Sequence, residues 1–341
     1  MSDTFKALVV EENSDGSFER AVRQWPLDRL PDHEVLVRVH YSSLNYKDAL
    51  SVSGNKGVTQ HYPHIPGIDA AGVVEQSSNN RFRPGDRVIV TSYDLGQNTS
   101  GGFGQYIRIP GDWIVPLPEG LTLFESMALG TAGLTAAIGV HHLRHNEVNP
   151  NDGPILVTGA TGGVGTMAIS ILSKLGYKVA AATGKTDQKE YLEKIGASSV
   201  IHREEVQDHS DRPLLSRRWA GVIETVGGIM LDTAIRQTHR AGTVACCGNV
   251  LGRELHTNVY PFILRGVHLA GIDSGYCCMK LRKQLWNRMA TDWKPSSLEQ
   301  IARTCSLEEL SMEIDTILEG QQTGRLVLKL GSSGIPAENT V

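Results

Sequence analysis

The sequence predicts an α/β protein of two domains, with a β-barrel-like domain first and a doubly wound parallel sheet after it. In residues 4–110, short apolar runs alternate with polar residues between Gly and Pro turns, a pattern typical of β-strands. From Pro154 onward, short strand-like runs alternate with helical patterns, which favours a parallel sheet with right-handed crossovers. A glycine-rich turn, Gly159 to Gly165, follows the first of these runs. These three observations support the fold prediction.

The bulk composition is that of an ordinary globular chain. With 341 residues, 40% of them hydrophobic, it is long enough for about two domains. A net charge of −4 provides no basic stripe for a phosphate backbone, so we expect no nucleic-acid partner. Residues 1–6 contain no apolar signal core, and no run approaches the ~18 apolar residues of a membrane span. We therefore expect no membrane partner and a cytoplasmic location.

The first domain is expected to span residues 1–123. Val35, Val37 and Val39 alternate with polar neighbours, and no helix of note is expected before about residue 121. Thr122 and Glu125 then form a capping-box pattern, which predicts a helix to about residue 142. The domain junction is placed here.

The second domain is expected to span residues 124–271 and to carry the parallel sheet. Its predicted strands cover 155–157, 179–182, 199–201, 220–223, 243–246 and 267–271, with helices to 175, over 187–195 and near 231–239. Residues 272–341 are expected to hold helices around 279–289 and 307–318 and a strand at 326–330. The family resemblance described below implies that this segment returns to the first domain. The polar residues 331–341 are expected to form a disordered tail.

The glycine-rich turn predicts a dinucleotide site. Gly159, Gly162, Gly163 and Gly165 supply a tight turn, a close approach to a pyrophosphate and close helix–strand packing. The N–H groups at the start of the following helix attract phosphates. The alternative reading is a tight strand-to-helix turn with no ligand.

The end of the second strand favours NADPH over NADH. An acidic residue there prefers the free 2′-hydroxyl of NAD, and this strand ends in Thr183-Gly184-Lys185 without a carboxylate. Lys185 and Arg203, which follows the third strand, can both meet a 2′-phosphate. Two alternatives stay open: both cations are solvated loop charges, or Asp187 accepts a ribose hydroxyl.

The order of these segments resembles the medium-chain dehydrogenase/reductase superfamily, whose domains are a GroES-like β-barrel catalytic domain and a Rossmann domain. Its zinc enzymes have a cysteine and a Gly-His-Glu motif in the first domain. This chain has no cysteine before Cys246, and Pro66-Gly67-Ile68-Asp69 stands in place of that motif. The chain therefore resembles the zinc-free quinone oxidoreductase branch, which implies no metal ligands.

Several strings are similar to those of the NADPH-dependent acryloyl-CoA reductases: residues 42–50, 65–69, 111–113, 130–133 and 261–265. The resemblance implies an acyl-CoA substrate and a homodimer, with strand pairing at 267–273. It also implies cofactor contacts, although Asn249 stands where an apolar residue is expected. These contacts are Tyr46, Thr161, Gly162, Gly163, Val164, Thr183, Gly184, Lys185, Arg203, Asn249, Ile263, Ser274 and, more weakly, Arg325.

The implied reaction adds hydride to the β-carbon of an enoyl thioester, after which the α-carbon needs one proton. Tyr46 is the candidate at this site, because a phenol is protonated at neutral pH and can donate. Asn45 is a candidate for orienting the substrate or nicotinamide ribose, and Asp48 for holding the loop and Lys47. The alternative for Tyr46 is a barrel tyrosine whose hydroxyl is satisfied by the protein.

Other functions and sites stay open. The chain can instead be a quinone or enone reductase acting on small electrophiles without coenzyme A, or a non-catalytic NADPH-binding structural protein or sensor. The cysteines are expected to be reduced core residues, and a metal at His141, His142 and His145 is a minor alternative. Six cations are candidates for the phosphates of coenzyme A or for solvated surface charges: Lys56, Arg81, Arg83, Arg265, Arg282 and Lys283.

Overall fold

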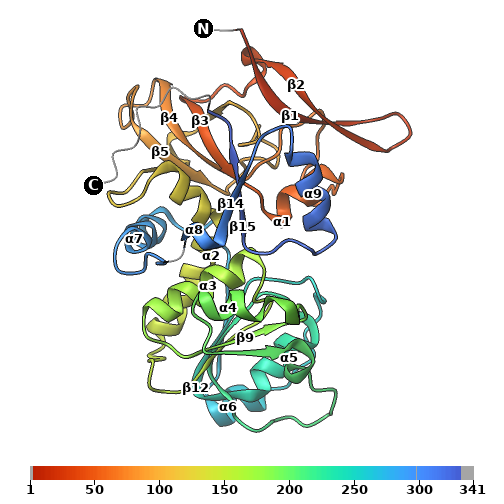
Figure 1. The fold of residues 1–341 in the computed structure, drawn as a ribbon, viewed down its shortest axis with the longest axis vertical. Coiled ribbons are helices and arrows are strands. Elements are labelled where there is room, and N and C mark those ends of the chain that lie inside the picture. The colour runs from red at the N-terminus through yellow and green to blue at the C-terminus, as the bar shows by residue number, and fades with distance from the viewer. Residues whose placement is uncertain (1–2, 297, 332–341) are drawn as a thin grey trace. The chain divides into compact units, whose positions relative to one another are not determined.

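The computed structural model describes residues 3–296 and 298–331 of the chain. By its internal contacts the chain divides into two compact units (Figure 1). Of the described residues, the first unit comprises 3–131, 275–290 and 302–331, and the second comprises 132–274, 291–296 and 298–301. The domain limits predicted from the sequence (1–123, 124–271 and 272–341) stay a prediction. The predicted tail, apart from Gly331, lies outside the described residues.

The first unit is built on a seven-stranded sheet in the order β14-β15-β3-β4-β5-β7, with β6 also paired to β3. Its C-terminal strand β15 pairs antiparallel with β3, Val327 facing Ser43, so the end of the chain completes the sheet that the beginning starts. The strands of this sheet are β3 (Val35–Ser43), β4 (Asp69–Ser77), β5 (Arg87–Thr91), β6 (Tyr106–Ile109), β7 (Ile114–Pro116), β14 (Ala302–Cys305) and β15 (Arg325–Lys329). A separate antiparallel pair is formed by β1 (Thr4–Glu12) and β2 (Phe18–Pro26).

The helices of this unit include one that the sequence analysis missed. The expectation of no helix before residue 121 is wrong, because α1 covers Tyr46–Val52. The helix is short and its start depends on a carboxylate cap. It therefore lacks the long apolar periodicity by which a helix is predicted from sequence. The other helices of the unit are α7 (Met279–Ala290) and α9 (Leu310–Leu318), with one-turn helices at Leu27–Arg29 and Gly111–Trp113.

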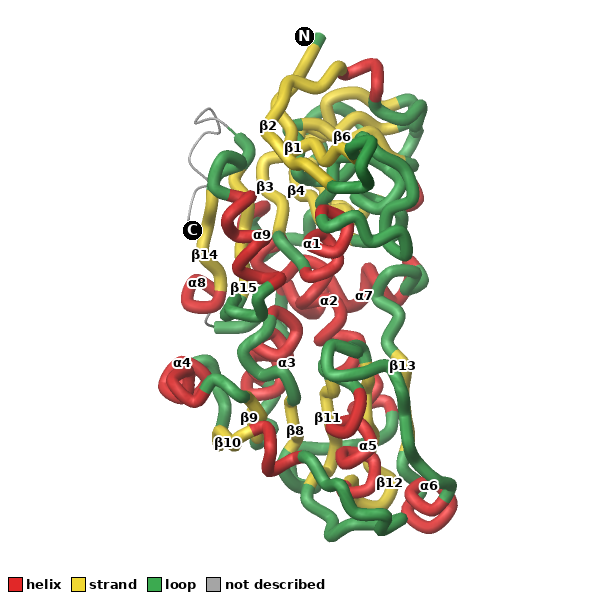
Figure 2. The backbone as a smooth tube through the Cα atoms, turned by 90° about the vertical axis from the view of Figure 1, so that its right-hand side faces the viewer, coloured by secondary structure: helices red, strands yellow, loops and turns green. Residues whose placement is uncertain are grey.

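The second unit contains a six-stranded parallel sheet in the order β10-β9-β8-β11-β12-β13. Numbered within the unit, this order is 3-2-1-4-5-6, that of the doubly wound dinucleotide-binding fold, so the predicted fold class is confirmed. Figure 2 shows β13 beside β12, at the edge of the sheet. The strands are β8 (Ile155–Val157), β9 (Val179–Thr183), β10 (Ser199–His202), β11 (Trp219–Glu224), β12 (Thr238–Cys246) and β13 (His268–Gly271).

Helices separate these strands, as the alternating pattern predicted. The helix expected near 231–239 begins earlier, at Gly228, and ends at Gln237, because β12 already starts at Thr238. The helices of the unit are α3 (Gly163–Lys174), α4 (Lys189–Lys194), α5 (Gly228–Gln237), α6 (Tyr260–Arg265) and α8 (Leu298–Ile301), with one-turn helices at Thr186–Gln188 and Arg203–Val206.

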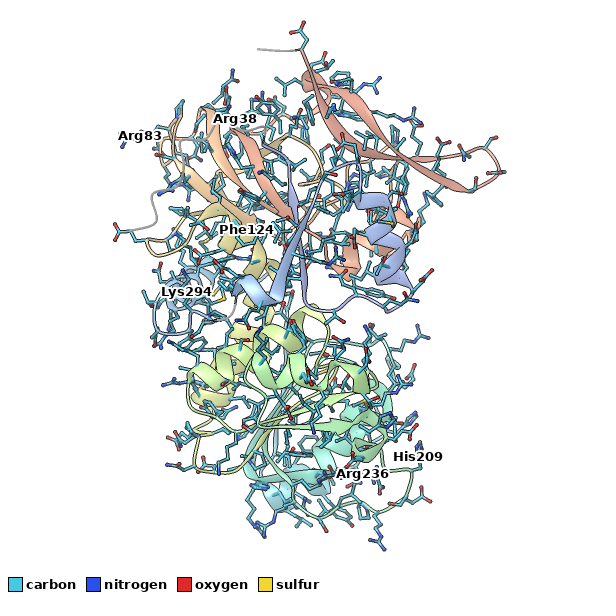
Figure 3. The ribbon with its side chains drawn as sticks, in the orientation of Figure 1. Arg38, Arg83, Phe124, His209, Arg236 and Lys294 are labelled. Atoms are coloured by element: carbon cyan, nitrogen blue, oxygen red, sulfur yellow. The ribbon has the colours of Figure 1, made fainter. Side chains whose placement is uncertain are left out.

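The longest helix, α2 (Leu123–His145), starts at the predicted capping box. Glu125 N–H donates to Thr122 Oγ1 at 3.0 Å, and Thr122 N–H donates to Glu125 Oε2 at 2.9 Å. Phe124, labelled in Figure 3, lies in its first turn. Its ring packs edge-on against that of Tyr41, with centroids 5.9 Å apart. The helix is interrupted at Gly130, whose φ of 53° and ψ of −156° are not helical.

By length and mean hydropathy, α2 meets the criteria for a membrane-spanning helix, although it contains no run of ~18 apolar residues. An 18-residue window of this helix has a mean hydropathy of 1.4. Of that window, however, 83% is buried inside the protein. The apolar character of α2 is therefore that of a core helix, whose side chains pack against other protein side chains.

Candidate active site and cofactor-binding residues

The glycine-rich turn joins β8 to α3 and leaves no room for side chains at two positions. Gly159 has a φ of 57°, and a Cβ there would lie 2.3 Å from Thr225 Oγ1. A Cβ on Gly165 would lie 2.4 Å from the Gly159 carbonyl oxygen. Gly162 is the N-cap of α3, whose first N–H groups have no partner within the helix. The turn can therefore accept the phosphates of a dinucleotide.

The residues predicted to read the 2′-phosphate come together at the ends of β9 and β10. Lys185 N–H donates to Thr183 Oγ1 at 3.0 Å, which fixes the turn after β9. Arg203 packs on Gly184: a Cβ on Gly184 would lie 3.1 Å from Arg203 Cδ and Nε and 3.2 Å from its Cζ. The exposed Arg203 guanidinium has no ion pair or hydrogen bond with the described residues. An anion can therefore bind it without displacing a protein partner.

Lys185 and Asp187 differ in their surroundings. Partial burial lowers the pKa of Lys185, and the charge of Asp187 opposes that shift. Asp187 accepts a hydrogen bond from Gln188 Nε2 at 2.7 Å. The structure thus offers the Asp187 carboxylate a local partner, and a contact with ribose would have to compete with it.

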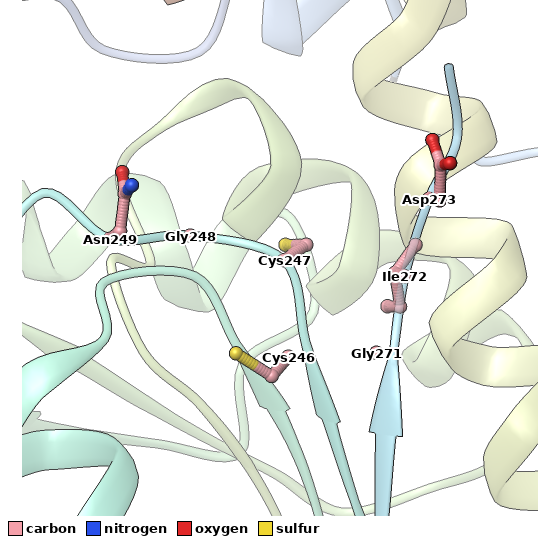
Figure 4. A pocket seen from close by; sticks show the side chains of 7 residues that line it. All are labelled: Cys246, Cys247, Gly248, Asn249, Gly271, Ile272 and Asp273. Carbon is pink, nitrogen blue, oxygen red and sulfur yellow. The ribbon is translucent and has the colours of Figure 1, made fainter. Parts of the chain in front are cut away.

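A cavity of about 530 Å³ lies at the carboxyl ends of β12 and β13 (Figure 4). This is the edge of the sheet at which doubly wound folds bind ligands. Asn249, a predicted cofactor contact, lines it. The remaining lining residues were not predicted: Cys246, Cys247, Gly248, Gly271, Ile272 and Asp273.

Two further predicted cofactor contacts lie outside the residues that line this cavity. Ser274 Oγ accepts a hydrogen bond from Thr135 Oγ1 of α2 at 2.8 Å. Ile263 lies on α6 with 68% of its surface exposed. Their cofactor roles stay predictions.

The three predicted catalytic residues lie at the start of α1, in different environments. Tyr46 is its first residue, is 43% exposed, and its hydroxyl has no hydrogen-bond partner among the described residues. Asp48 is fully buried and accepts from Asn45 N–H and Ile68 N–H, each at 2.8 Å. Burial, with a smaller contribution from the charge of Asp69, raises the pKa of Asp48 to about 7. Asp48 therefore caps the helix, and Tyr46 is the residue available to a ligand.

Asp69, the first residue of β4, is the centre of a buried hydrogen-bond network that the sequence analysis did not assign to the site. Its Oδ2 accepts from Ser43 Oγ at 2.6 Å, Asn45 Nδ2 at 2.8 Å and Thr131 N–H at 2.9 Å. Its Oδ1 accepts from Thr131 Oγ1 at 2.5 Å. Every contact donates to the carboxylate, so the network satisfies its ionised form.

Arg325 supplies the opposite charge, with Nη2 3.8 Å from Asp69 Oδ2 and 2% of the residue exposed. It donates to Asn45 Oδ1 at 3.1 Å and Ser43 Oγ at 2.8 Å, and also to two backbone carbonyls. Asp69 and Arg325 thus hold the two ends of the Asn45 amide. Asn45 fixes the start of α1, whereas contacts of Asn45 with the substrate and of Arg325 with the cofactor stay predictions.

This network could not be predicted from the sequence, because its members lie far apart along the chain. Asp69 appears in the string 66–69, which served only to mark a departure from a metal motif. A carboxylate in a strand start of small and apolar residues (Asp69-Ala70-Ala71-Gly72) is a mark of a buried polar contact, because an unpaired charge there is costly. Its partners could not be assigned without the fold.

Two of the six candidate coenzyme A cations are not surface charges. Arg282 is fully buried and donates to Thr91 O at 2.9 Å, Thr91 Oγ1 at 2.7 Å and Gly275 O at 3.1 Å. Arg265 donates to Arg236 O at 2.7 Å and Leu215 O at 2.6 Å. The expectation of solvated charges is wrong for this pair, because both guanidinium groups donate hydrogen bonds to backbone carbonyls.

Among the described residues, no group of three or more His, Cys, Asp or Glu has the arrangement of a metal site. The His141 and His145 rings stack with centroids 5.9 Å apart on one face of α2. The five cysteines are free thiols, and burial raises the pKa of Cys246 to about 11 and that of Cys247 to about 12.

Two family models match the chain. The alcohol dehydrogenase GroES-like domain matches residues 31–119, and the zinc-binding dehydrogenase model matches residues 163–291. The first match falls in the first unit, and the second match covers most of the parallel sheet.

Related proteins match nearly the whole chain. YhfP of Bacillus subtilis, named provisionally as a quinone oxidoreductase, is 46% identical over 97% of this chain and 100% of its own. The acrylyl-CoA reductase AcuI of Ruegeria pomeroyi is 43% identical over 96% of this chain and 100% of its own.

Solved structures show the same fold. The YhfP structure, with NAD bound, has a TM-score of 0.94 at 46% identity and covers 96% of this chain and 100% of its own. The yhdH oxidoreductase of Salmonella enterica, in complex with NADP, has a TM-score of 0.93 at 40% identity, with 96% and 100% covered.

Proposed function

The chain belongs to the zinc-free quinone oxidoreductase branch of the medium-chain dehydrogenase/reductase family, and from that membership we propose that it reduces the 2,3 double bond of acrylyl-CoA to propionyl-CoA with NADPH. One observation carries this proposal: full-length similarity, at 43% identity, to a protein named acrylyl-CoA reductase. Family membership makes the chain an oxidoreductase, and the substrate is the proposed part.

The choice of NADPH is supported by the arrangement after β9. Arg203 packs on Gly184 and has no ion pair or hydrogen bond with the described residues, and Lys185 directly follows Gly184, so two cations are available to bind a 2′-phosphate. The Salmonella relative is in complex with NADP, whereas the Bacillus relative has NAD bound. The preference between the two cofactors is therefore a property that this chain's own residues must decide.

The residues of the first unit fit the proton-transfer half of the reaction. When bound, NADPH supplies a hydride to the β-carbon of the thioester. The negative charge then spreads to the thioester oxygen, and the α-carbon requires a proton. Tyr46 is exposed, and no described residue forms a hydrogen bond with its hydroxyl, so it can donate that proton. Asn45 is held by Asp69 and Arg325, and it thereby fixes the start of α1, where Tyr46 lies.

A second candidate function is the reduction of quinones or simple enones that lack coenzyme A. The observation that favours it is the 46% identity to YhfP. The same hydride chemistry serves both substrates, because each is an electron-poor conjugated double bond.

The test compares NADPH oxidation with acrylyl-CoA, crotonyl-CoA and benzoquinone. We expect acrylyl-CoA to have the highest kcat/KM, with crotonyl-CoA lower by roughly 10- to 200-fold, since a pocket discriminates one methyl group by only about 1–3 kcal/mol. A higher kcat/KM for benzoquinone would replace the proposal with the second candidate. Cofactor binding without turnover on any of the three would indicate a non-catalytic protein.

We also propose that the chain forms a homodimer by pairing two copies of β13. This strand is at the edge of its sheet, and apolar side chains near it are exposed: 39% of Leu269, 68% of Ile263 and 50% of Leu264. Open edges with exposed apolar residues favour strand pairing. Light scattering after size-exclusion chromatography should report twice the 37.1 kDa of one chain, and a monomer would contradict the proposal.

A further inference from the structure

Glu224 is a buried carboxylate that has no part in the site or the reaction described above. It is the last residue of β11, between β8 and β12 in the sheet, and is fully buried. No lysine, arginine or histidine of the described chain forms an ion pair with it. Burial raises its pKa, and hydrogen bonds from Gly227, Val226 and Thr158 oppose that shift.

The carboxylate is held by donors from three directions. Thr158 Oγ1 donates to Oε1 at 3.0 Å. The N–H groups of Val226 and Gly227 donate to Oε1 at 3.0 Å, and Gly227 N–H also reaches Oε2 at 2.9 Å. Cys246 Sγ lies 3.8 Å from Oε2. Glu224 thus connects the ends of β8, β11 and β12.

The connection to Thr158 acts directly on the glycine-rich turn. Thr158 immediately precedes Gly159, and its Oγ1 accepts from Thr225 N–H at 2.8 Å. In return, Thr225 Oγ1 donates to Thr158 O at 2.8 Å. Because Gly159 also packs against Thr225 Oγ1, these bonds set where the turn begins.

The connection to Gly227 acts on the wall of the 530 Å³ cavity. Gly227 lies against the 248–252 loop: a Cβ there would lie 2.4 Å from Gly252 O and 2.9 Å from Gly248 O. Gly248 packs still more closely on Thr225, because a Cβ there would lie 1.8 Å from Thr225 O. Gly248 and Asn249 line the cavity. The same carboxylate therefore holds both the turn and this wall.

We propose that Glu224 is the positioning residue of the dinucleotide site. Its carboxylate fixes the position of the glycine-rich turn relative to the cavity wall formed by residues 246–249. The inference rests on the proposed use of a nicotinamide dinucleotide. It assigns Glu224 no contact with the cofactor. Its effect is confined to the pyrophosphate and nicotinamide parts, because Thr183, Lys185 and Arg203 belong to other strand ends.

The experiment measures dissociation constants of the full chain for NADPH, NADH and 2′-AMP, which carries the 2′-phosphate and adenosine but no pyrophosphate. In Glu224→Gln we expect the dissociation constants for NADPH and NADH to rise at least about tenfold, as for the loss of hydrogen bonds to a charged group. That for 2′-AMP should stay within about twofold. Thr158→Val, which removes the same contact from the turn, should show the same pattern if Glu224→Gln does not fold.

Thr238→Val is the matched control, because it removes a buried hydrogen bond, from Thr238 Oγ1 to Ala234 O at 2.7 Å, at the opposite end of β12. It should leave all three constants unchanged. Wild-type dinucleotide affinity in both Glu224→Gln and Thr158→Val, or parallel loss of 2′-AMP and NADPH binding, would overturn the inference. Failure of the wild type to bind either dinucleotide would overturn it together with the proposed function. Dinucleotide binding without reduction of acrylyl-CoA would overturn the proposed function alone.

Discussion

Two neighbouring residues, Asn45 and Tyr46, have opposite surroundings. The Asn45 amide donates to Asp69 and accepts from Arg325, and the residue is 9% exposed. Tyr46 is 43% exposed. A side chain whose donors and acceptors are already used holds structure, whereas a free hydroxyl can act on a ligand. Tyr46 therefore stays the proposed proton donor of the first unit.

Replacing Tyr46 by phenylalanine removes the hydroxyl and keeps the ring. We expect kcat with acrylyl-CoA to fall by about tenfold or more, because the α-carbon loses its proton donor. Steady-state kinetics measure the effect. Tyr62→Phe is the control, since it also removes a tyrosine hydroxyl beside α1, one that donates to Ser51 O. Full activity of Tyr46→Phe would mean that solvent or another group supplies the proton.

Arg203 and Lys185 determine cofactor preference if their charges meet the 2′-phosphate. In Arg203→Ala and in Lys185→Ala, the ratio of kcat/KM for NADPH to that for NADH should fall by about tenfold, with the NADH value little changed. Arg217→Ala, which removes an exposed arginine of the same unit, should leave the ratio unchanged. An unchanged ratio in both variants would exclude this assignment.

Sequence patterns could predict some of these residues and not others. The glycine-rich turn and the Thr183-Gly184-Lys185 end are short local motifs, so their places at the ends of strands could be predicted from spacing. Their contacts with a cofactor stay predictions. Asp69 and Glu224 act through partners that meet only in the folded chain: Arg325 for the first, and Thr158 and Cys246 for the second. A single sequence contains no signal for such pairings.

The helix α1 illustrates how one titrating group supports an element. Asp48 is buried in its first turn, and its pKa is raised from 3.8 to about 7. The folded chain therefore holds a proton that the unfolded chain releases between about pH 4 and pH 7. This contribution to stability is full below pH 4 and is lost as the pH rises through 7.

The expected result is a pH-dependent difference between the wild type and Asp48→Asn. On lowering the pH from 7 to 5, the wild type should gain stability relative to the variant by at most about 1.4 kcal/mol per pH unit. Urea unfolding at several pH values measures it. Ser51 lies in the same helix, and Ser51→Ala removes its buried 2.6 Å hydrogen bond to Thr59 without changing a titrating group. The difference in stability between the wild type and Ser51→Ala should therefore not depend on pH. A constant difference for Asp48→Asn would contradict the pKa shift.

Local sequence patterns predicted the start of helix α2 but not its interruption. The capping box at Thr122 predicted its start. The interruption at Gly130 was not predicted, because its cause is tertiary: a Cβ there would lie 2.6 Å from Asp69 Oδ2 and 2.7 Å from Ser43 Oγ. The interruption frees Thr131 N–H for the carboxylate.

Across the whole molecule, the sequence predicted the type and order of most elements, whereas it predicted less of which strands pair. Alternation of strands and helices was enough for the parallel sheet, since its crossover rules leave few topologies. The antiparallel sheet is less constrained: β15 lies between β14 and β3, although β3 precedes them by most of the chain. Only the resemblance to a family placed that return.

The raised pKa values of Cys246 and Cys247 have a consequence for a chain that handles electrophiles. Acrylyl thioesters and quinones alkylate thiolates readily, and the thiol form is a poor nucleophile. With pKa values of about 11 and 12, both sulfur atoms lining the cavity are protonated at neutral pH. Burial next to the Glu224 carboxylate thus makes these two thiols poor nucleophiles toward electrophiles of the kind that we propose as substrates.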